Sequence, residues 1–228
     1  MIDKAVYLTV YEFYILLTRG NPHGLVMFEE IQGYIPDREE IAQGVLSLLE
    51  KNYLETVDND AFCLTKDVQT VLDIMDKAKS TFVISGHLSS CPMQCLYFSG
   101  GLCLILQMDD FRDGYVRIEV QDSAETVNGL LDYDFMLDMG ENQTEDEFES
   151  KDTIAMKQFE PDMDIETVLS DEEVMLIVDQ YPRYSNCPVR RAVIYSDEER
   201  YFLSVCGNGE RETEMFRNES FSNLFVGD

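Results

Sequence analysis

Apolar residues in the first 80 positions recur with the period of a helix. Capping boxes at Thr9–Glu12 and Asp37–Glu40 predict where two of these helices begin. A shorter helical segment is expected over residues 28–35, because Pro36 follows it. The two main apolar stripes consist of Val10, Phe13, Tyr14 and Leu17, and of Ile41, Val45, Leu48 and Leu49.

A small hairpin and a further helix complete this first region. Residues 53–57 and 61–64 form two short runs separated by an Asp-Asn-Asp turn, which predicts a two-stranded hairpin. Thr65 then begins a helix that carries Val68, Leu72 and Met75 on one face. Helix, helix, helix, hairpin, helix is the order of a winged helix. We therefore interpret residues 1–80 as a winged-helix-like helical module.

From residue 81 the pattern changes to the alternation of strands. The runs 81–86, 95–99, 102–108 and 115–121 predict an antiparallel meander of about four strands.

Helical spacing returns after residue 121. Ser123 is expected to cap one helix, and Ser170 with Glu173 forms a capping box for another that would cover residues 174–181. Residues 154–159 are interpreted as a strand, and residues 191–206 as a hairpin.

These elements predict an α+β fold with a central antiparallel sheet flanked by two helical modules, the first of them winged-helix-like. The expected division is a helical module over 1–80, and a sheet plus a second helical module over 81–228, packed with the first as one unit.

Charge narrows the classes of partner. The chain has 228 residues with 45 acids against 17 bases, a formal net charge of −28, which opposes binding to phosphate-rich surfaces. Residues 121–180 hold 19 of the acids and two of the bases, so the excess is concentrated there. Residues 138–152 carry seven acids and one lysine, which predicts a solvated or disordered loop.

No motif in the chain predicts a reaction. Phosphate-binding, nucleophile-elbow and zinc-protease motifs are absent from the sequence, so we expect no enzyme, no catalytic residue and no cofactor. His87, Cys91 and Cys95 share an even spacing, but a second ligand pair is missing and we expect no metal site. The acids of 162–173 resemble a calcium loop but have Thr167 where that loop needs glycine.

The compartment expected from the sequence is the cytoplasm. The N-terminus lacks the pattern of a signal peptide, and the six dispersed cysteines are expected to be reduced core thiols. Residues 80–108 contain no charged side chain, but polar residues and glycines interrupt them too often for a membrane span.

Two turns place an apolar residue where exposure is costly, and they predict a protein interface. The candidate partner-binding residues are Cys91, Pro92, Met93, Phe111 and Arg112.

Three short segments resemble the EspG family of type VII (ESX) secretion chaperones. They are residues 8–12 (LTVYE), residues 48–54 (LLEKNYL) and residues 192–202 (AVIYSDEERYF). Asn52 and Glu199 stand where that family often has glycine. The resemblance implies a central antiparallel sheet between two helical bundles. It also implies a cytosolic protein that holds a small helical secreted protein before export.

Two other functions remain open at this point. A winged-helix transcriptional regulator would use the helix over 38–51, whose outward positions include Arg38, Glu39 and Glu50. An acidic DNA-mimic protein would instead need its negative charge spread along one face. If the protein is instead a chaperone of the EspG type, we expect no binding to nucleic acid, because the chain has too few basic residues to release the counterions of DNA.

Overall fold

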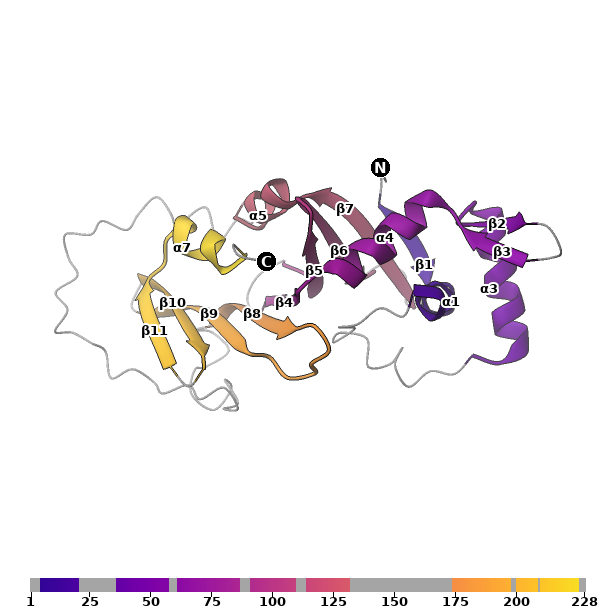
Figure 1. The fold of residues 1–228 in the computed structure, drawn as a ribbon. Coiled ribbons are helices and arrows are strands. Elements are labelled where there is room, and N and C mark those ends of the chain that lie inside the picture. The colour runs from indigo at the N-terminus through magenta and orange to yellow at the C-terminus, as the bar shows by residue number, and fades with distance from the viewer. Residues whose placement is uncertain are drawn as a thin grey trace.

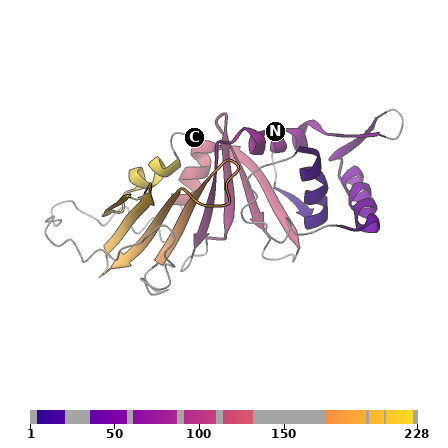
Figure 2. The same ribbon diagram turned by 60° about the horizontal axis from the view of Figure 1, so that its bottom comes forward.

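The computed structural model describes residues 5–20, 36–57, 61–86, 91–109, 114–131, 174–197, 200–208 and 210–225. The molecule is elongated, with the N-terminal helices and the last strands at opposite ends (Figures 1 and 2). Several predicted features lie outside these residues: the helix over 28–35, the acidic loop over 138–152, the strand over 154–159, and the calcium-like acids of 162–173.

The described residues form an α and β fold around a single nine-stranded sheet in which every neighbouring pair is antiparallel. Its order is β1-β7-β6-β5-β4-β8-β9-β10-β11. In chain order the strands are β1 (Val6–Thr9), β4 (Ser80–Gly86), β5 (Gln94–Ser99), β6 (Leu102–Met108), β7 (Tyr115–Asp122), β8 (Val174–Pro182), β9 (Arg190–Asp197), β10 (Arg200–Gly207) and β11 (Glu210–Met215).

The four-stranded meander and the late hairpin agree with the sequence patterns. Strands β4 to β7 are the meander, and β9 with β10 is the hairpin expected over 191–206. Strand β1 was not expected, because its four residues are too few to show an alternation and lead directly into a helix. It pairs with β7 from Val6 opposite Ile118 to Thr9 opposite Tyr115.

The helix predicted over residues 174–181 is wrong, since these residues form β8. This strand lies inside the sheet between β4 and β9. Leu176 and Val178 belong to the core on one face, whereas Ile177 belongs to the core on the other. A strand buried on both faces is apolar at consecutive positions, so its pattern cannot be told from that of a buried helix.

The helices of the first module begin where the sequence predicts. They are α1 (Val10–Gly20), α3 (Arg38–Glu50) and α4 (Lys66–Lys77), with the hairpin β2 (Leu54–Val57) and β3 (Ala61–Leu64) between the last two. Both capping boxes are present, since Thr9 N–H donates to Glu12 Oε2 at 2.7 Å and Asp37 N–H donates to Glu40 Oε2 at 2.8 Å. Without residues 28–35, the winged-helix order is seen only in part.

Asn52 ends α3 in the left-handed conformation, with φ of 58°. Tyr53 N–H donates to Leu48 O at 2.8 Å, and Asn52 N–H donates to Leu49 O at 3.0 Å. This is a Schellman motif, in which asparagine replaces the usual glycine.

The two faces of the sheet carry different helices. On one face, α1 and α4 pack on the strands of the first half and α3 packs against α1, in a core that includes Leu48, Met75 and Tyr97. On the other face, α5 (Ser123–Leu131), α7 (Asn218–Ser222) and the short helix η3 (Asn223–Phe225) pack on strands from both halves.

The expected second helical module is smaller than predicted in the residues that the structure describes. There it consists of α5, α7 and η3, while β8 to β11 supply most of the C-terminal region. The cap of α5 also differs from the expectation: Asp122 Oδ1, and not Ser123, accepts from Ala124 N–H at 2.8 Å.

Candidate interaction surface

The predicted turn residues are only partly described. Cys91 is buried, Pro92 is half-buried and Met93 is 52% exposed. Phe111 and Arg112 lie outside the described residues. Because Gln94 pairs with Gln107 near the end of β6, Met93 lies at the end of the sheet where β6 leaves it.

A row of side chains crosses four strands at this same end of the sheet. Tyr7 of β1 lies opposite Arg117 of β7, Arg117 lies opposite Gln107 of β6, and Gln107 lies opposite Gln94 of β5. Residues directly opposite each other on antiparallel strands project from the same face. We call these four residues the cross-strand row, and Met93 directly precedes its last member.

The part of this row nearest the sheet edge is exposed. Tyr7 is 37% exposed and the side chain of Arg117 is 38% exposed, whereas Gln107 and Gln94 are buried. Helix α5 begins at the other end of β7, so it covers the far end of this face and leaves the row uncovered by the described helices.

Hydrogen bonds hold the polar side chains of the surface in place. Arg117 Nη2 donates to Glu119 Oε2, and Arg117 Nη1 donates to Gln107 Oε1 at 3.4 Å. Gln121 Nε2 donates to the other carboxylate oxygen of Glu119. The guanidinium is therefore oriented before any partner arrives, which lowers the entropic cost of using it in an interface.

The buried thiols next to this surface are unsuited to nucleophilic chemistry. Burial raises the pKa of Cys103 to about 12, so its thiol is protonated at neutral pH. Cys91 and Cys95 are also buried, and Gln94 Nε2 lies 3.8 Å from Cys91 Sγ. Within the described residues, no three His, Cys, Asp or Glu side chains are grouped so that they could hold a metal ion. His87 of the zinc-like triplet is not among those residues.

The surface of α3 is a poor site for DNA. Its outward side carries Glu39 and Glu50 with Arg38. Lys51, at its C-terminal end, has its ammonium engaged by Glu12 at 2.7 Å. Each phosphate contact needs a free cation or polar donor, so this helix has little to offer a duplex.

The sequence predicted an exposed Met93, which the structure shows, but it did not predict Tyr7 or the row. Arg117 and Glu119 could have been placed on one face from the alternation of β7. Tyr7 could not, because β1 was not recognised and only the sheet register brings it beside Arg117.

Among the described helices, none has the length and apolar character needed to cross a membrane.

Comparisons with known proteins find similarity among solved structures only. No family model matches the sequence, and no curated protein matches it. Among solved structures, the chain is similar to the Mycobacterium tuberculosis type VII secretion system chaperone EspG5, determined in complex with a PE25–PPE41 dimer. That alignment has a TM-score of 0.49 and 10% sequence identity, and it covers 96% of this chain and 94% of that chain.

Proposed function

We propose that this protein is a binding protein without catalytic activity, and that it holds a small helical protein on the sheet end formed by Met93 and the cross-strand row. The observation that carries the proposal is the presence of exposed Tyr7, Arg117 and Met93 at one end of the sheet. Tyrosine and arginine are enriched among the residues that dominate protein interfaces. Methionine adapts its shape to an apolar partner surface.

The dimensions of the row support a helical partner. Its exposed ends, Tyr7 on β1 and Met93 directly before β5, lie three strand spacings apart, about 14 Å, and a helix with its side chains is about 10–12 Å wide. The row offers a single cation, Arg117, which is already paired with Glu119. A protein surface with its own polar rim suits this arrangement better than a nucleic acid does.

The finer proposal is that the partner is a small secreted protein held in the cytoplasm before type VII export. Its support is the resemblance of residues 8–12, 48–54 and 192–202 to the EspG chaperone family. Tyr7 directly precedes the first of these segments. The proposed contact also includes the turn residues Cys91 and Pro92, with Phe111 and Arg112 of the neighbouring turn.

A capture experiment tests this function. The full chain carrying an affinity tag is expressed in its native host, and co-purified proteins are identified by mass spectrometry. We expect one small protein that is helical by circular dichroism and co-elutes with the chain in gel filtration. Recovery of no protein, together with sub-micromolar binding to duplex DNA at physiological salt, contradicts the proposal.

A further inference from the structure

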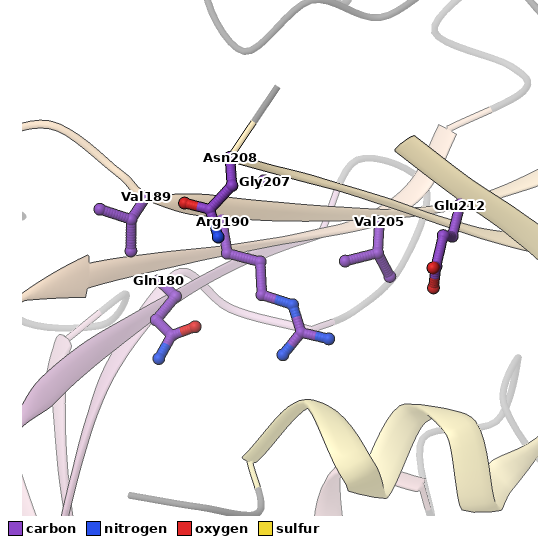
Figure 3. Close-up of a pocket in the computed structure, with 7 residues that line it drawn as sticks. All are labelled: Gln180, Val189, Arg190, Val205, Gly207, Asn208 and Glu212. Atoms are coloured by element: carbon purple, nitrogen blue, oxygen red, sulfur yellow. The ribbon is translucent and has the colours of Figure 1, made fainter. Parts of the chain in front are cut away.

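A second surface feature lies on the same face of the sheet, over strands β8 to β11. It is a pocket of about 260 Å³, open to solvent, at the end of the sheet where β10 passes into β11. Figure 3 shows the side chains of Gln180, Arg190, Val205 and Glu212 projecting from the strands on one side. The full lining is Gln180, Val189, Arg190, Val205, Gly207, Asn208 and Glu212.

The two charged groups of this pocket have no ion-pair partner within the described residues. The ion pairs there involve Lys51, Lys77, Arg117, Arg183 and Arg191. Arg190 and Glu212 take part in none of these ion pairs.

Strand register explains why the two charges do not neutralise each other. Arg190 on β9 lies opposite Gly207 on β10. Two residues away, Val205 on β10 lies between Ala192 on β9 and Glu212 on β11. The two residues are thus two strands apart and offset by two positions, which separates their Cα atoms by about 12 Å.

Glycine keeps the space between them open. A Cβ on Gly207 would lie 3.2 Å from Val189 O, a tight approach to backbone, and 3.5 Å from Arg190 Cγ, in ordinary contact. The floor of the pocket is consequently backbone and the side chain of Val205, with Val189 at the rim. Val205 thus lies between one cation and one anion, with the polar side chains of Gln180 and Asn208 also in the lining.

We propose that this pocket binds a zwitterion of dipeptide size, with its carboxylate at Arg190 and its ammonium at Glu212. Two extended residues span about 7 Å between their ends, and a contact of about 3 Å at each end brings the total near the separation of Arg190 and Glu212, whose side chains project from the same side of the sheet. Val205 and Val189 would contact small aliphatic side chains of the ligand. The proposal is independent of the proposed function, because it uses strands β8 to β11 and not the cross-strand row.

Calorimetry with matched ligands tests the site on the full-length protein. The probes are L-alanyl-L-alanine, its C-terminal amide, which lacks the carboxylate, and N-acetyl-L-alanyl-L-alanine, which lacks the ammonium. Since a hydrogen bond to a charged group contributes about 1.5–3 kcal/mol, we expect the free dipeptide to bind at least about tenfold more tightly than either derivative.

Two substitutions then assign each charge to its residue. Arg190→Gln should weaken the free dipeptide about tenfold and remove its advantage over the amide. Glu212→Gln should do the same for its advantage over the acetylated probe. Arg38→Gln and Glu55→Gln, both on exposed positions of the first module, serve as matched controls and should change nothing.

Three results would overturn the proposal. They are no binding of the dipeptide to the wild type at 10 mM, equal binding of all three probes, and equal effects of the pocket and control substitutions. Circular dichroism and melting temperature of each variant confirm that it is folded before it is titrated.

Discussion

Lys51 places its ammonium nitrogen 2.7 Å from each carboxylate oxygen of Glu12 and thereby ties the end of α3 to the start of α1. Glu12 is 1% exposed. Burial by itself would raise the pKa of Glu12, but hydrogen bonds from Lys51, Ser47 and the backbone of Thr9 bring that pKa below its ordinary value. One carboxylate thus serves both as a helix cap and as the anchor of a neighbouring helix.

Removing the lysine should expose the cost of this buried charge. Lys51→Met leaves Glu12 ionised without its cation and should lower the free energy of unfolding by about 3 kcal/mol. Glu12→Gln can still accept the capping hydrogen bond, so the double variant should be more stable than Lys51→Met alone. Urea unfolding of the four proteins in this double-mutant cycle measures the coupling. Additive effects of the two substitutions would show that the pair is not coupled.

The same carboxylate should make stability depend on pH. Its folded-state pKa is depressed below 4.5, so its contribution is complete above that pH and is lost as the pH falls through the lower folded value. The difference in unfolding free energy between wild type and Glu12→Gln should therefore shrink below pH 4.5. Urea unfolding of both proteins from pH 7 to pH 3 measures this difference. A difference in unfolding free energy that grew as the pH fell would contradict a lowered pKa of Glu12 in the folded state.

Gly44 marks the close crossing of α1 and α3. A Cβ built there would lie 2.5 Å from Ile15 Cδ1, so the isoleucine must move. Alanine is favoured over glycine in a helix by about 0.5–1 kcal/mol, and this contact should cancel the gain in Gly44→Ala. In an Ile15→Val background, which lacks Cδ1, the gain should reappear.

Gly129 in α5 is the matched control for that prediction. A Cβ at Gly129 meets no atom within 4 Å, so Gly129→Ala should stabilise the protein by about 0.5–1 kcal/mol outright. Thermal unfolding of the variants compares the two sites. Equal gains at Gly44 and Gly129 in the wild-type background would exclude a close contact at Gly44.

The chain is expected to fold as one unit and not as two separable domains. The sheet crosses from the first half to the second where β4 pairs with β8, from Ser80 opposite Pro182 to Gly86 opposite Leu176. Cutting between them exposes two long strand edges. Residues 1–120 and 121–228 expressed apart should each be insoluble or lack cooperative unfolding by circular dichroism. Cooperative folding of both fragments alone would contradict this expectation.

Features set by neighbouring residues were predicted well. The capping boxes at Thr9 and Asp37 were recognised because each signal lies within four residues. The meander and the late hairpin were recognised because short apolar runs are separated by turns such as Gly100–Gly101, and because β7 alternates between its two faces. The exposure of Met93 was predicted because its place in a turn is visible in the sequence, and its role in binding stays a prediction.

Features set by distant pairing were not predicted. Strand β8 is buried on both faces, so it lacks the alternation that distinguishes a strand from a helix. Strand β1 is short and obtains its conformation from β7, more than a hundred residues away. The neighbourhood of Tyr7 and Arg117, and the placement of Arg190 and Glu212 around one pocket, depend on such pairings and have no local signal.

Affinity for the captured partner tests the central claim most directly. Purified partner is titrated into wild type and into Tyr7→Ala, Arg117→Ala and Met93→Ala by calorimetry. The controls are Tyr184→Ala and Leu46→Ala, which remove a tyrosine and an apolar side chain that are 66% and 61% exposed away from the row. We expect the first three to weaken binding at least about tenfold, in the range of interface hot spots, with unchanged melting temperatures. Unchanged affinity in all three, with loss in Tyr184→Ala or Leu46→Ala, would place the partner elsewhere and contradict the account.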